Sequence, residues 1–121
     1  MNNVKIEIIG VKEAIKKIDM KNREIREKVS AAINREALKV EGEVKQSIAG
    51  RRSEPRSVDT GKFMQSVTTI PGILEASIET NVAYAKFLEY GTSKMMPRQH
   101  FRNTAARMRE KVIAEIKESV R

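Results

Sequence analysis

The sequence predicts an α+β domain in which one long helix, a short helix and a C-terminal helix pack on a small, mostly antiparallel sheet. Residues 4–8 and 74–80 alternate apolar and polar side chains, as half-buried strands do. Apolar residues recur every three or four positions through 22–49 and 101–120, as in amphipathic helices. We expect a single domain over residues 1–121, a length that allows a modest core.

The N-terminal part is expected to contain one strand and two helices. The strand over 4–8 ends at Gly10, and a short helix follows over 11–18. Asp19 is a candidate cap for the long helix over about 22–49. At 1.5 Å per residue this helix spans roughly 40 Å, more than a short chain can cover. Part of its flank is therefore expected to face a neighbour.

Residues 50–58 are predicted to form a mobile basic loop, because the stretch is polar and contains both glycine and proline. Arg51, Arg52 and Arg56 are its basic side chains. They are candidates for contact with nucleic acid or with the acidic edge of a neighbouring copy.

An antiparallel hairpin is expected after this loop. Residues 65–70 are predicted as its first strand and 74–80 as its second. Pro71 and Gly72 between them are typical of a type II turn.

The short helix is predicted over 82–90 and ends at Gly91, a C-cap residue. Tyr84, Phe87 and Leu88 share one face of it. We expect Tyr84 and Leu88 in the core, although aromatic residues are also favoured as interface anchors.

The turn after the short helix is expected to form part of an interface. Met95 and Met96 precede Pro97 and are predicted to be exposed there. Glu89 is expected to form an ion pair with the basic loop of a neighbouring copy.

The C-terminal helix follows Pro97. Its apolar stripe comprises Phe101, Ala105, Met108, Val112, Ile116 and Val120. His100, the only histidine, is expected at the surface or in an interface, and we include Phe101 in the candidate interface with it. No histidine or glutamate lies at helical spacing from His100, so we do not expect it to be a metal ligand or a catalytic base.

Composition excludes several classes of site. The chain has no cysteine, so it has no disulfide, thiolate metal site or cysteine nucleophile. The glycines are scattered singly, which excludes a phosphate-binding loop, and we expect no cofactor. No stretch approaches the roughly 18 apolar residues of a membrane span, and no secretion signal is recognisable. The net charge of +8 is spread along the chain, as on a solvated basic surface.

Asp59-Thr60-Gly61 matches the aspartic-protease triplet, and a homodimer supplies two such carboxylates. A protease needs this aspartate after a buried apolar strand, whereas residues 54–58 are polar. We interpret the triplet as a turn capped by Asp59 or Thr60, with Gly61 allowing a tight backbone.

Three segments together resemble the Hong Kong ninety-seven phage gene-ten family of neck and tail-completion proteins. The segments are Asp59-Thr60-Gly61-x-Phe63-x-x-Ser66-Val67, Val82-Ala83-Tyr84-Ala85-x-x-Leu88-Glu89-x-Gly91-Thr92 and Pro97-x-x-His100-Phe101. The resemblance covers nearly the whole chain. Phe63 stands where leucine is usual, and Met95-Met96-Pro97 replaces a more proline-rich turn.

The resemblance implies a non-enzymatic virion subunit at the joint between capsid and tail, assembled in the host bacterial cytoplasm. Expected partners are copies of itself in a ring, other head-connector and tail proteins, and passing DNA contacted without sequence preference. The long helix, the 50–58 loop and the 91–97 turn are the candidate surfaces. A stand-alone, sequence-nonspecific DNA-binding protein and a dimeric aspartic protease remain the alternatives.

Overall fold

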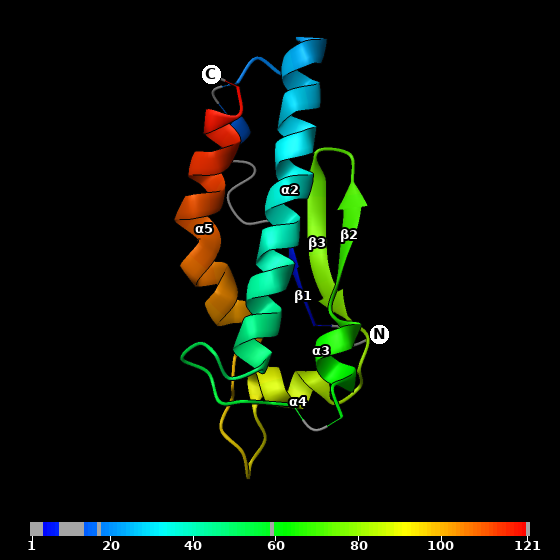
Figure 1. The fold of residues 1–121 in the computed structure, drawn as a ribbon, viewed down its shortest axis with the longest axis vertical. Coiled ribbons are helices and arrows are strands. Elements are labelled where there is room, and N and C mark those ends of the chain that lie inside the picture. Colours follow the sequence, from blue (N-terminus) through cyan, green and yellow to red (C-terminus); the bar gives the residue numbers. More distant parts are fainter. Residues whose placement is uncertain (1–3, 8–13, 17, 59, 121) are drawn as a thin grey trace.

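The structure is a computed structural model that describes residues 4–7, 14–16, 18–58 and 60–120. Its elements are β1 (Val4–Glu7), α2 (Arg23–Ile48), α3 (Lys62–Ser66), β2 (Thr68–Gly72), β3 (Glu75–Thr80), α4 (Ala85–Tyr90) and α5 (His100–Glu118). The predicted α+β class is confirmed: a three-stranded antiparallel sheet packs against the long helix and the C-terminal helix. Figure 1 shows α2 and α5 side by side along the long axis, with the sheet beside α2.

The sheet has the order β1-β3-β2, so the hairpin's second strand lies in the middle. Val4 of β1 lies opposite Thr80, and Thr68 of β2 lies opposite Glu79. Alternate residues of β3 are buried against the helices, as the period-two pattern predicts; they are Ala76, Ile78 and Thr80.

Helix α2 carries the largest share of the core. Asn22 caps it, because Asn22 Oδ1 accepts a hydrogen bond from the Ile25 backbone N at 3.2 Å. The prediction of Asp19 as the cap is wrong: its carboxylate accepts from the Lys21 N instead. The buried apolar row comprises Val29, Ala32, Ile33, Ala37, Val40, Val44 and Ile48. This row contacts the sheet on one side and α5 on the other.

The hairpin turn lies two residues later than predicted. Pro71 and Gly72 belong to β2 and pair with Ala76 and Glu75. Proline is tolerated there because β2 is an edge strand, where one row of backbone N–H groups has no partner in the sheet. The turn consists of residues 73–74, between the two strands.

Other helix and strand boundaries also differ from the predicted ones. Gln65 and Ser66 are the last residues of α3, so the strand predicted over 65–70 begins only at Thr68. The short helix predicted from residue 82 begins at Ala85. Half of the helix predicted over 11–18 lies outside the described residues. Among the described helices, none has the length and apolar character needed to cross a bilayer.

Candidate functional site

Glu89 is buried and caps α5 within its own chain. Its Oε1 accepts from the Phe101 N at 2.9 Å, and its Oε2 accepts from the Arg102 N at 2.9 Å and Arg102 Nε at 3.1 Å. The side chain is only 2% exposed. Backbone N–H groups in the first turn of a helix lack partners, and a carboxylate satisfies them and the positive end of the helix dipole. The predicted ion pair between Glu89 and a neighbouring copy is therefore wrong.

The 91–97 turn is built on a close approach of the backbone to itself. Gly91 has φ +80°, and a Cβ there would lie 2.8 Å from both the Met95 O and the Pro97 N. Thr92 N donates to Met95 O at 2.8 Å, and the two residues form a β-bridge. Met96 then points outward and is 83% exposed, whereas Met95 is half-buried. The prediction of an exposed methionine at this turn is confirmed for Met96 only.

Helix α4 exposes its aromatic residues. Its buried residues are Ala85 and Glu89, one helical turn apart. Tyr84, predicted to be in the core, is 43% exposed, because the inward face of so short a helix is taken by those two residues. The Tyr84 ring contacts Phe63 edge to face, with centroids 6.0 Å apart. Leu88 is half-buried against the core, in agreement with the prediction.

The two aromatic residues within α4, Phe87 and Tyr90, are also exposed, and a cation lies over each. Lys86 Nζ lies 5.3 Å from the Phe87 centroid, and the Arg102 guanidinium carbon lies 4.6 Å from the Tyr90 centroid. Phe87 and Tyr90 are nevertheless 47% and 59% exposed. The surface of α4 and the 91–97 turn thus combines exposed aromatic rings, Met96 and basic side chains.

The Thr60-Gly61 part of the aspartic-protease triplet leads into α3. Thr60 Oγ1 accepts from the Lys62 N at 3.3 Å, as a capping turn requires, and Gly61 has φ +86°. Asp59 lies outside the described residues. Ser66 fastens α3 to the sheet, because its Oγ donates to the Phe63 O at 2.6 Å and lies 2.5 Å from Thr80 Oγ1. The context is a loop before a helix, not the buried strand that a protease site needs.

His100 is completely buried, so its predicted place at the surface is wrong. Its Nδ1 lies 2.8 Å from Ser47 Oγ and its Nε2 lies 2.8 Å from Ser57 Oγ. Ser47 donates its own proton to Glu54 Oε1 at 2.5 Å, so His100 Nδ1 carries the proton that Ser47 accepts. Burial lowers the pKa of His100 to about 4, with Arg98 and Arg107 acting in the same direction. The imidazole is therefore neutral at pH 7.

Phe101, also placed in the candidate interface, is 1% exposed. It belongs to the core stripe of α5, and its backbone N is held by Glu89. The prediction that Phe101 forms part of an interface is wrong for the same reason as for His100. Both residues occupy the first turn of α5, which is clamped against α2 and α4.

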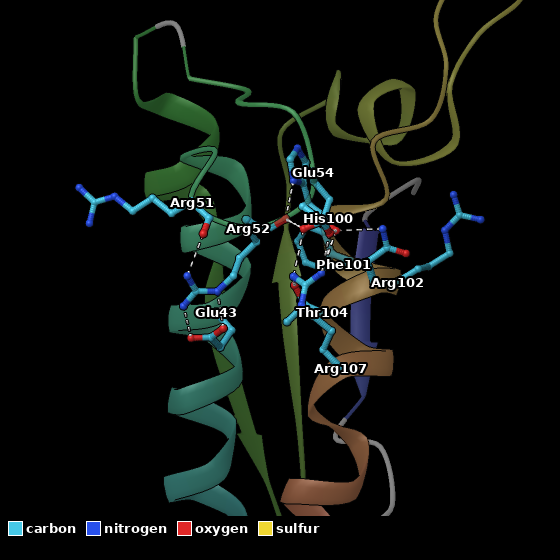
Figure 2. A network of polar contacts seen from close by, with 12 residues as sticks. Glu43, Arg51, Arg52, Glu54, His100, Phe101, Arg102, Thr104 and Arg107 are labelled. Carbon is cyan, nitrogen blue, oxygen red and sulfur yellow. Dashed lines mark hydrogen bonds and ion pairs between the residues drawn. The ribbon is translucent and has the colours of Figure 1, made fainter.

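Glu54 ties the 50–58 loop to α5 (Figure 2). Arg107 donates to both of its oxygens, at 2.8 and 3.0 Å, and Asn103 Nδ2 donates at 3.0 Å. Burial alone would raise the pKa of Glu54, but the hydrogen bonds from Arg107, Ser47, Ser53 and Asn103 hold it far below its usual range. Glu54 is thus an ionised, fully paired carboxylate.

The loop predicted to be mobile is therefore fastened at several points. Besides Glu54, the Ser57 N donates to the Ile48 O at 2.7 Å. Arg52 forms a bidentate ion pair with Glu43, in which Nε and Nη2 each donate to a carboxylate oxygen at 2.9 Å. Arg51 and Arg56 are exposed, and Figure 2 shows Arg51 extending away from the polar network. Two of the three arginines thus remain candidates for outside contact.

The Ser57–His100 pair has the separation of a nucleophile and its base, but its other contacts favour a structural role. Ser57 Oγ accepts from Arg98 Nη1 at 2.9 Å and lies 3.3 Å from the Pro55 O. His100 Nδ1 meets Ser47, not a carboxylate. These contacts satisfy the polar groups that packing of the loop buries. We interpret the pair as a fastening for the loop.

A pocket of about 540 Å³ opens between this loop, α3 and α4. Its apolar wall is formed by Val58, Phe63, Tyr84 and Leu88. Arg56, Lys62 and Arg98 also line it and provide basic charge. The pocket joins the basic loop and the turn before α3, which follow each other in sequence, to Tyr84 and Leu88 at α4, which lie far along the chain.

Sequence reasoning missed the Ser47–Glu54–His100–Arg107 network. One signal for it exists: His100, Thr104 and Arg107 share a face of α5 through spacings of four and three. Ser47 likewise lies in the buried row of α2, between Val44 and Ile48. Polar residues in a buried row require partners. Spacing along the sequence does not indicate which loop residue supplies them.

Among the described residues, no cluster of histidine, aspartate and glutamate is suited to hold a metal ion. Comparison with known proteins found no matching protein family, no matching curated protein and no matching solved structure.

Proposed function

We propose that this protein is a structural subunit of a long-tailed bacteriophage or prophage that acts at the head–tail junction, in the neck or in tail completion. It acts by protein–protein contacts within a ring of its own copies and with head-connector and tail proteins. The support is the resemblance of three spaced sequence segments to the gene-ten family, together with the roles their residues have in the fold.

The observation that carries the proposal is that the described motif residues build a scaffold. Glu89 caps α5 and Gly91 closes the turn before it. Gly61 begins α3, and Ser66 attaches that helix to β3. A motif whose polar residues are used in capping and turns specifies a shape, and the function then depends on what the shape exposes.

The shape exposes a surface suited to binding other proteins. Tyr84 at the start of α4, Phe87 and Tyr90 within it and Met96 in the following turn are all at least 43% exposed. Aromatic residues and methionine are enriched at protein interfaces, because they offer large contact area at low entropic cost. Exposed apolar groups gathered on one segment are typical of protein interaction sites.

The proposal is tested in a phage or lysogen that carries the gene. Deletion is expected to give separate filled heads and tails in electron micrographs, and infectivity is expected to fall by several orders of magnitude. Purified protein added to such a lysate is expected to restore joined particles. Intact, fully infectious virions without the gene product would overturn the proposal.

A sequence-nonspecific DNA-binding protein is the second candidate, favoured by the net charge of +8 and by exposed Arg51 and Arg56. The two candidate functions require different affinities for DNA. A DNA-binding protein needs tight association with duplex on its own, whereas a junction subunit needs only weak contact with DNA that passes through.

A further inference from the structure

The tip of the β2–β3 hairpin is apolar where a turn is normally polar. Ile73 is 91% exposed, the most exposed large apolar side chain described. Leu74 beside it has φ +53°, a left-handed conformation that a leucine adopts only at a cost in energy. Two-residue hairpin turns favour glycine, asparagine and aspartate for this reason. An exposed isoleucine on a strained turn is explained by a contact that covers it.

The tip also carries an acidic group. Glu75 is exposed and pairs with Gly72 at the first position after the turn. A surface that binds this tip should therefore combine an apolar hollow with basic charge beside it.

The pocket between the 56–58 segment, α3 and α4 has these properties. Its volume of about 540 Å³ is ample for an isoleucine side chain, and Val58, Tyr84 and Leu88 offer an apolar lining. Arg56 and Lys62 are exposed at its edge and suit a carboxylate.

The two surfaces lie at opposite ends of the sheet, as Figure 1 shows: the β2–β3 turn is at one end, and α3 and α4 are at the other. The hairpin of a copy is thus directed away from that copy's own pocket. A tip that meets a pocket on another copy makes a head-to-tail contact, the kind that produces closed rings.

We propose that the hairpin tip of one copy, Ile73 with Glu75, docks into the pocket at Tyr84 of a second copy, with Glu75 facing Arg56 and Lys62. This inference rests on the proposed function, because it names the contact through which the ring subunits join.

The first experiment uses two variants of the full chain that each disable one surface. Ile73→Asn replaces the apolar tip by a residue that suits the turn, and Tyr84→Asp places a charge in the pocket wall. In sedimentation velocity, each variant alone is expected to self-associate at least about tenfold more weakly than the wild type. An equimolar mixture is expected to form heterodimers, because one intact tip still meets one intact pocket. Ala106→Asp, at an exposed position of α5, is the matched control and should assemble normally.

The second experiment exploits the absence of cysteine from the sequence. A chain carrying both Ile73→Cys and Tyr84→Cys should form a ladder of disulfide-linked oligomers on mild oxidation. A chain with Ala106→Cys and Tyr84→Cys should not do so above its collisional background.

Three results would overturn the inference: a wild type that stays monomeric at its highest soluble concentration, an oligomer that Ile73→Asn leaves unchanged, or a mixture without heterodimers. A phage with the Ile73→Asn gene separates this failure from failure of the proposed function. Normal joining by that phage, with loss of joining on deletion, would reject the contact and keep the function.

Discussion

At the scale of the residue, two buried polar side chains determine how the first turn of α5 is held. Glu89 accepts hydrogen bonds from backbone N–H groups of this turn, and His100 connects it to Ser47 of α2 and Ser57 of the loop. Both side chains are nearly inaccessible to solvent, so their contributions depend on complete pairing.

Replacement of Glu89 is expected to destabilise the fold strongly. Glu89→Ala leaves the Phe101 and Arg102 N–H groups without their acceptor and should lower the free energy of unfolding by about 3 kcal/mol. Glu89→Gln keeps one acceptor oxygen and should lose about half as much. Urea denaturation measures both values. A loss below about 0.5 kcal/mol for Glu89→Ala would contradict the capping role.

Stability is expected to fall between pH 6.5 and 4 because of His100. Its pKa is lowered from 6.5 to about 4 in the folded protein, so in this interval the unfolded chain binds more protons. The free energy of unfolding should therefore decrease as the pH falls, by roughly 2–3 kcal/mol over the interval. The lowered pKa of Glu54 acts in the same direction, but only below its ordinary value of 4.5.

Two measurements check this pH dependence. Urea unfolding at pH 7, 6 and 5 gives the slope, and His100→Gln should flatten it above pH 5. Because His100 is the only histidine, its ring proton resonance can be followed without assignment ambiguity. A resonance that titrates near pH 6.5 in the folded protein would contradict the assignment of a buried, neutral ring.

At the scale of the element, the 91–97 turn depends on the special backbone conformation of a glycine, whereas α2 does not. Gly91 has positive φ and no room for a Cβ. Gly42 lies in the middle of α2, and a Cβ added there would have no neighbour within 4 Å. The two glycines therefore form a matched pair for one substitution.

Gly91→Ala is expected to lower the free energy of unfolding by about 2–4 kcal/mol, because the added Cβ would overlap the Met95 O and the Pro97 N. Gly42→Ala should raise it by about 0.5–1 kcal/mol, since alanine loses less entropy in a helix. Thermal denaturation followed by circular dichroism compares them. Equal effects of the two substitutions would show that the turn does not constrain the fold.

At the scale of the whole molecule, the basic charge is partly neutralised by internal ion pairs. Arg52, Arg102 and Arg107 pair with Glu43, Glu89 and Glu54. Arg51 and Arg56 remain exposed on a loop that is held in place. Contact with DNA through them should be electrostatic and insensitive to sequence.

Fluorescence anisotropy with two unrelated duplexes tests this expectation. The two affinities should agree within about twofold and weaken by about tenfold or more between 50 and 200 mM salt. Arg51→Glu with Arg56→Glu should reduce the salt slope by about two, whereas Arg23→Glu at the start of α2 should not. Tight binding of both duplexes would favour the stand-alone DNA-binding protein, and discrimination between the duplexes would contradict the expectation.

The sequence by itself determined the fold class, the extent of α2 and α5 and the role of Gly91. Periodicity and local backbone requirements depend only on residues that are close in sequence. Tertiary structure alone decided the positions of Glu89, His100 and Tyr84. Whether a polar residue is buried depends on partners such as Ser47 and Ser57 that lie 53 and 43 residues from His100, and sequence spacing carries no record of those distances.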